Sequence, residues 1–137
     1  MGNEQRKSYY ERHKVELCKK TLDQYIPQSI KKINALIPEK INIYYKDFPY
    51  EIYGEPVIKK RMHYWKIQEN CLEYQECYSA AMQGYLYSIH RCALCNYTYA
   101  EFYIRKMINI AIICALVATS EDKKMIRLDD EKNGRRY

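Results

Sequence analysis

The chain has 137 residues, of which 47% are hydrophobic and 29% charged, and it carries a net charge of +6. This length and balance predict one compact domain and exclude a chain that is disordered or embedded throughout in a membrane. With only four glycines, the chain has little material for a glycine-rich cofactor loop.

Residues 4–37 are predicted to form one kinked amphipathic helix or a pair of amphipathic helices. Val15, Cys18 and Leu22 recur at three- and four-residue spacing among charged residues, as on a helix with one apolar face. Pro27 suits the first position of a second helix, whose apolar side consists of isoleucines. The early acidic residues and the lack of an apolar start argue against a presequence or a secretory signal, so we expect no cleaved targeting segment.

Residues 38–56 are predicted to be an extended, irregular arm that lies on this protein or on a partner. They show no helical period and contain Pro49, Gly54 and Pro56. A long connection without regular structure commonly carries function, and tyrosine suits contact surfaces because it joins an aromatic body to a polar tip. Codon bias is an alternative explanation for the sixteen tyrosines. The predicted partner contacts are Tyr44, Tyr45, Tyr50, Tyr53, Tyr64, Tyr74 and Tyr78.

Residues 57–124 are predicted to form long helices. A stripe of mostly apolar residues runs from Tyr64 to Tyr99 at alternating spacings of three and four, which is typical of one helix face. A second stripe follows Gly84, so we expect the later half to be more completely buried. A break near Gly84 or Asn96 allows two long helices to run antiparallel.

Together these segments predict an all-α fold. We expect a helical bundle or a long antiparallel helical hairpin with a Tyr-rich irregular arm, in a single helical domain covering residues 1–137. Residues 125–137 are predicted to be a polar tail, because charged and polar residues dominate there.

Residues 107–120 carry no charge. A helix that spans a membrane needs ~20 predominantly apolar residues, and charged residues bracket this run closely on both sides. We therefore expect a core helix that is buried on all sides. The alternative is a helix that rests against a membrane or a membrane-protein neighbour, with Arg105 and Lys106 at the polar boundary.

The six cysteines are the chain's main candidate chemistry, and four of them form a candidate disulfide or thiol cluster: Cys71, Cys77, Cys92 and Cys95. If the chain reverses between Cys77 and Cys92, either those two or Cys71 with Cys95 face each other. Zinc normally requires a second closely spaced pair beside Cys92 and Cys95, which Cys71 and Cys77 do not supply, so no metal site is predicted. The alternative is buried free thiols that act as small apolar residues.

We expect no catalytic residues, no cofactor and no enzyme activity. The sequence contains no phosphate-binding loop, no metalloprotease motif and no nucleophile elbow. His13, His63 and His90 are isolated from one another along the sequence.

Two functions remain. The first is a structural subunit of a large multiprotein assembly that binds other protein subunits. An intracellular, mitochondrial inner-membrane complex of the respiratory chain is the expected setting, because small helical accessory subunits with cysteines are common there. The alternative is a free-standing helical module that binds an anionic surface or a partner helix. Basic pairs such as Lys19–Lys20 alternate with acids and match no nucleic-acid motif.

Overall fold

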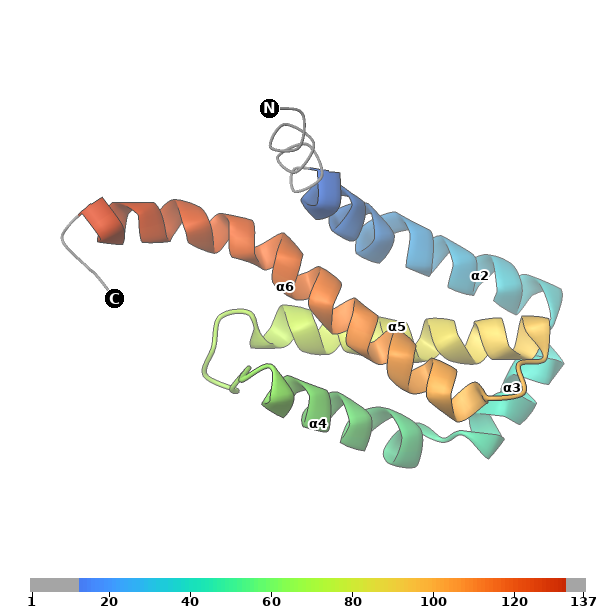
Figure 1. Ribbon diagram of the computed structural model, residues 1–137. Coiled ribbons are helices and arrows are strands. Elements are labelled where there is room, and N and C mark those ends of the chain that lie inside the picture. Colours follow the sequence, from blue (N-terminus) through green and yellow to red (C-terminus); the bar gives the residue numbers. More distant parts are fainter. Residues whose placement is uncertain (1–12, 133–137) are drawn as a thin grey trace.

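The computed structural model describes the backbone of residues 13–132 and the side chains of residues 13–119. All regular elements in this part of the chain are helical, which confirms the predicted all-α fold (Figure 1). After a helix over residues 13–20, the elements are η1 (Thr21–Tyr25), α2 (Ile26–Leu36), α3 (Pro38–Asp47), η2 (Tyr50–Gly54), α4 (Glu55–Tyr64), α5 (Tyr74–Cys95) and α6 (Ala100–Lys132).

The first helix continues past Pro27 instead of stopping before it. The wide π turn η1 joins residues 13–20 to α2, and the amide of Ile26 donates to the carbonyl of Thr21 across it. Proline has no amide hydrogen to give to the preceding turn, and a local π turn is one way for a helix to absorb that loss. Residues 13–36 are therefore one continuous helical segment instead of two separate helices, and residues 4–12 lie outside the described part.

The segment 38–56 is helical, so the predicted irregular arm was wrong. Pro38 occupies the first turn of α3, Pro49 directly precedes η2, and Pro56 lies in the first turn of α4. The first amides of a helix have no intrahelical acceptor, so proline loses nothing there, and its fixed φ favours the helix. These prolines begin helices, whereas we had interpreted them as breaking structure.

The centre of the fold is the antiparallel pair α5 and α6, which confirms the prediction of long helices in the second half. Asn96 closes α5 in the left-handed conformation with φ of 52°, at one of the two predicted breaks. The other predicted break, Gly84, lies inside α5. The loop 65–73 separates α4 from α5, and α6 extends to Lys132, so residues 125–132 are helical where a tail was predicted. Residues 133–137 lie outside the described part.

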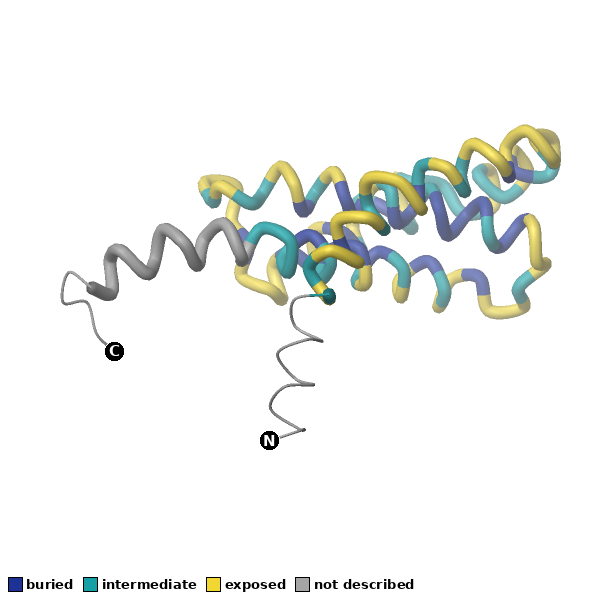
Figure 2. Tube along the Cα trace, turned by 90° about the horizontal axis from the view of Figure 1, so that it is seen from above, coloured by how far each residue is buried: buried dark blue, intermediate teal, exposed yellow. Residues whose placement is uncertain are grey.

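In Figure 1, α2 lies above the α5–α6 pair and α4 lies below it. The buried residues follow the inward sides of the helices, while the outward sides are exposed (Figure 2). The later half of α5 is almost continuously buried, as the second stripe predicted. The core consists of Ile33, Ile41, Ile58, Met62, Ile67, Cys77, Ala80, Ala81, Tyr85, Ile89, Ala93, Ile104, Ile108, Ala111, Ile112 and Ala115.

Candidate functional site

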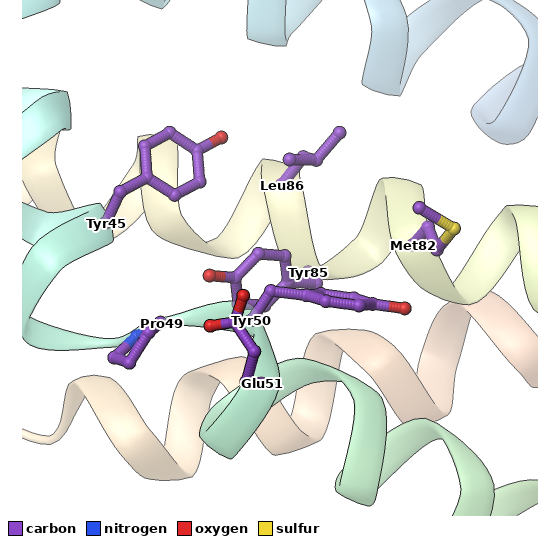
Figure 3. Close-up of a pocket in the computed structure, with 7 residues that line it drawn as sticks. All are labelled: Tyr45, Pro49, Tyr50, Glu51, Met82, Tyr85 and Leu86. Carbon is purple, nitrogen blue, oxygen red and sulfur yellow. The ribbon is translucent and has the colours of Figure 1, made fainter.

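A hollow of about 350 Å³ lies between the end of α3, the η2 segment and the middle of α5. Figure 3 shows the rings of Tyr50 and Tyr85 at its centre, with Met82 and Leu86 of α5 beside them. The π turn η2 positions Tyr50 here, because it brings that side chain over the buried face of α5. The lining is mainly aromatic and aliphatic, with Glu51 as its carboxylate.

The hydroxyls around this hollow are engaged within the protein. The hydroxyls of Tyr50 and Tyr78 form a hydrogen bond of 2.9 Å, and the Tyr85 hydroxyl donates to the Phe48 carbonyl at 2.6 Å. The rings of Tyr50 and Tyr85 meet edge to face with centroids 5.4 Å apart, a favourable aromatic geometry. These contacts fasten the chain between α3 and α4 onto α5, so they stabilise the fold.

Burial keeps these phenols protonated. It raises the pKa of Tyr45 to about 12. The pKa of Tyr50 is raised further by burial and by the hydrogen bond with Tyr78, and burial with nearby Tyr45 and Glu51 likewise raises that of Tyr85. A phenolate is the form needed for nucleophilic attack or proton abstraction, and at neutral pH this environment opposes it.

His90 is buried near this hollow and is held as a neutral imidazole. Its Nδ1 lies 2.7 Å from the Leu86 carbonyl and 3.5 Å from the Tyr45 hydroxyl. Because a carbonyl oxygen can only accept a hydrogen bond, Nδ1 carries the hydrogen and donates a hydrogen bond to the Leu86 carbonyl. Burial lowers the pKa of His90, although this hydrogen bond partly opposes the effect. The side chain thus connects Tyr45 to α5.

Most tyrosines predicted as partner contacts pack against this chain's own core. Tyr64 is the exception, since its side chain is exposed at the end of α4, edge to face with Trp65. The hydroxyl and ring contacts of the others connect α3, η2 and α5. The six predicted contact tyrosines that pack against the core are Tyr44, Tyr45, Tyr50, Tyr53, Tyr74 and Tyr78.

The structure separates the two cysteines of each candidate disulfide pair. Cys77 and Cys92 lie on the same helix, α5, and fifteen residues of helix place them ~22 Å apart. Cys71 precedes α5 and Cys95 is its last residue, so that pair also lies at opposite ends and neither pairing can form. All six cysteines lie in the described part of the chain as reduced thiols without a disulfide, and burial together with Cys95 raises the pKa of Cys92 to about 11.

The apolar run 107–120 belongs to α6. Among the described helices, the stretch Ala100–Thr119 is long and apolar enough to cross a membrane, with a mean hydropathy of 1.6, and 33% of it is buried inside the protein. Ile104 and Ile108 form part of its buried side. The helix predicted to be buried on all sides is therefore buried on one side only, and membrane contact by the other side remains a prediction.

A second candidate site lies where the start of α6 passes η2 and α4. Two hollows of about 250 and 440 Å³ both have Arg105 in their walls. The side chains of Ile52, Tyr99 and Phe102 are 63%, 78% and 70% exposed, although all three are large and apolar. We call this surface the Arg105 face, and it consists of Ile52, Pro56, Val57, Lys60, Arg61, Tyr99, Glu101, Phe102 and Arg105.

The charges of the Arg105 face are predominantly positive. Arg105 pairs with Glu101 at 2.6 Å, one helical turn away. The guanidinium of Arg61 lies over the Tyr64 ring at 5.7 Å from its centroid, a cation–π contact. Lys60 has no ion pair with a described side chain. Three cations thus surround the smaller hollow, whose other walls are Ile52, Pro56 and Val57.

Sequence reasoning did not identify the apolar residues of this face. One signal was present, because Ile104, Ile108 and Ile112 recur every four residues and Phe102 falls outside that register. No comparable signal marked Ile52, since its exposure depends on how η2 lies beside α6.

Among the described residues, no group of three or more His, Cys, Asp or Glu side chains is arranged to hold a metal ion. In comparisons with known proteins, no family model, no curated protein and no solved structure matches the chain.

Proposed function

We propose that this protein is a non-enzymatic, structural accessory subunit of a larger multiprotein assembly. The observation that carries the proposal is the Arg105 face, where exposed Phe102, Tyr99 and Ile52 surround an arginine. Large apolar side chains that are exposed together on one face are costly to leave in water and mark sites where proteins associate. Aromatic residues and arginine are also the side chains most enriched in the centres of protein interfaces.

The charges on this face indicate which chemical groups the partner's contact surface contains. Lys60 and Arg61 stand beside an apolar hollow, and Arg105 keeps donors available beyond its single contact with Glu101. A partner subunit that places a carboxylate beside aliphatic side chains matches both properties. We therefore propose an acidic and apolar segment of another protein as the occupant.

The proposed setting is a mitochondrial inner-membrane complex of the respiratory chain. What supports a membrane-associated assembly is the stretch Ala100–Thr119 of α6, which has the length and hydropathy of a spanning helix but is partly occupied by core contacts. Its remaining apolar surface suits a membrane or a membrane-protein neighbour. Cell fractionation followed by salt and detergent extraction tests this setting separately from the assembly itself.

The test is gentle purification of a tagged copy from its own organism, followed by native-gel sizing. We expect migration well above the 16.6 kDa of the single chain. The variant Phe102→Ser is expected to release most of the protein from the assembly, because it removes a large exposed ring from the Arg105 face. Leu72→Ser is the matched control, since Leu72 is 89% exposed in the loop before α5 and lies outside that face. Migration of the wild type as a lone chain would overturn the proposal.

A second candidate function is a free-standing module for an anionic surface, and the cluster of Lys60, Arg61 and Arg105 favours it. Electrostatic binding of this kind weakens steeply with salt, whereas an interface centred on buried aromatic rings does not. Flotation with vesicles containing phosphatidylserine, at low and at physiological salt, distinguishes the two. Salt-sensitive flotation that Lys60→Glu abolishes and Phe102→Ser preserves would favour the module over the subunit.

A further inference from the structure

Two cysteines from distant parts of the sequence meet between the N-terminal helix and α6. Cys18 is 7% exposed, although its neighbours in the helix over residues 13–20 are mostly exposed or only partly buried. The thiol of Cys18 is in hydrogen-bond contact with that of Cys114 in α6. The two thiols therefore lie next to each other where the N-terminal helix and α6 meet.

A second observation places the same two segments side by side. Leu22, one turn after Cys18, and Ala115, the neighbour of Cys114, line the same hollow. Leu22 also packs against the hydrophobic core. Figure 1 shows the N-terminal helix beside the middle of α6. Both cysteines thus lie on regular helices at a packed crossing.

We propose that Cys18 and Cys114 are a covalent modification site that forms an intramolecular disulfide and fastens the N-terminal helix to α6. Disulfides require the two Cα atoms to lie within about 7 Å, so the link requires this spacing where the N-terminal helix passes α6. This inference is independent of the proposed assembly function.

The reaction needs a two-electron oxidant, and a small-molecule disulfide such as oxidised glutathione supplies it. One protein thiolate attacks the glutathione disulfide, forming a mixed disulfide and releasing one glutathione thiolate. The second protein thiolate attacks the protein sulfur of that mixed disulfide and displaces the other glutathione. Two protein thiols thereby lose two electrons and two protons, and one glutathione disulfide becomes two glutathione thiols.

The surroundings of Cys114 affect how fast this happens. Burial and the hydrogen bond with Cys18 raise the pKa of Cys114 to about 12, although nearby Lys14 partly opposes the rise. Because the thiolate is the reactive form, exchange at this pair should be slow at neutral pH and faster as the pH rises. A buried pair of this kind is expected to persist once it is oxidised.

The test uses the full chain, incubated in its folded state with oxidised and reduced glutathione, then alkylated and analysed by mass spectrometry. We expect two fewer alkyl groups than the six of the reduced protein, and a linked peptide pair containing Cys18 and Cys114. Cys18→Ser and Cys114→Ser should each abolish the link, whereas Cys71→Ser should preserve it. The oxidised wild type should also unfold at a higher temperature than the reduced protein.

Three results would overturn the proposal. The first is incorporation of all six alkyl groups at every glutathione ratio. The second is glutathione adducts on Cys18 or Cys114 without a link between them. The third is a link between Cys92 and Cys95 while Cys18 and Cys114 are both alkylated. Because each result is obtained with the wild-type chain, the test does not depend on whether a variant folds.

Discussion

Gly84 of α5 lies directly against the backbone carbonyl of Met107 in α6. A Cβ atom placed on Gly84 would stand 2.8 Å from that carbonyl oxygen and 2.9 Å from the Cβ of Ala111. Neither atom belongs to the flexible end of a side chain, so neither can move unless the helix moves. The residue is therefore glycine because α5 and α6 approach closely here, and α5 continues through it without a break.

Gly84→Ala is accordingly expected to destabilise the fold, even though alanine has the higher helix propensity. Overpacking at a helix contact typically costs about 1–3 kcal/mol, and the free energy of unfolding in urea measures it. Ser79→Ala is the matched control, because Ser79 is exposed on the same helix and should change stability by less than ~0.5 kcal/mol. Equal stability of the two variants would show that the helices are not in tight contact at Gly84.

The parts of the fold that were predictable are those in which local pattern and burial agree. In α5 the three-four stripe passes through Ala81, Tyr85 and Cys92, all of which are buried. The end of α5 was also predictable from the sequence, because Asn96 is one of the few residues that readily adopt a left-handed conformation. Each of these signals lies within one helix.

The predictions that were wrong concern features that depend on tertiary contacts, which the spacing of residues in the sequence does not show. Proline either breaks a helix or begins one, and the choice at Pro38 and Pro56 depends on where the flanking helices start. The contact between Cys18 and Cys114 depends on which helices are neighbours in space. Tyrosine spacing likewise does not distinguish a ring that packs on the core, such as Tyr85, from one that faces a partner.

Tyr85→Phe tests whether the tyrosine hydroxyls support the fold. The substitution keeps the ring but removes the donor to the Phe48 carbonyl at 2.6 Å, leaving a partly buried acceptor without that bond. Loss of such a bond costs about 1–2 kcal/mol, measurable by chemical unfolding. Tyr99→Phe serves as the control, because the Tyr99 side chain is largely exposed, and it should leave stability unchanged. If both variants unfold alike, the hydroxyl of Tyr85 contributes nothing.

The buried tyrosines predict loss of stability in alkali. In the folded protein, burial raises the pKa of Tyr45 from 10.0 to about 12, and it also raises the pKa values of Tyr50, Tyr85 and Tyr87. A group whose pKa is raised on folding stabilises the protein fully below its unfolded pKa, and this stabilisation is lost as the pH rises through the folded pKa. Stability should therefore fall from about pH 10 upward.

Absorbance of the phenolate, recorded together with circular dichroism, measures this coupling. We expect the exposed tyrosines to ionise first without loss of helix. The buried tyrosines should ionise only as the protein unfolds. In the Tyr45→Phe variant the alkaline midpoint should move to higher pH, because one of the buried phenols no longer has to ionise. Ionisation of every tyrosine near pH 10 with the helices intact would contradict the burial seen around α5.

The last prediction concerns backbone conformation and uses one substitution at two lysines. Lys66, in the turn after α4, has φ of 58°, which places it in the left-handed region that a lysine side chain disfavours by about 1–2 kcal/mol. Lys66→Gly removes this strain but increases the freedom of the unfolded chain, so we expect a net gain of about 0.5–1 kcal/mol. Lys60→Gly, within helix α4, has no strain to relieve and should lose about 0.5–1 kcal/mol. Urea unfolding of both variants measures the two changes against the same wild type. Opposite signs follow if the turn conformation is present in solution, and a loss of stability at both positions would show that Lys66 does not adopt it.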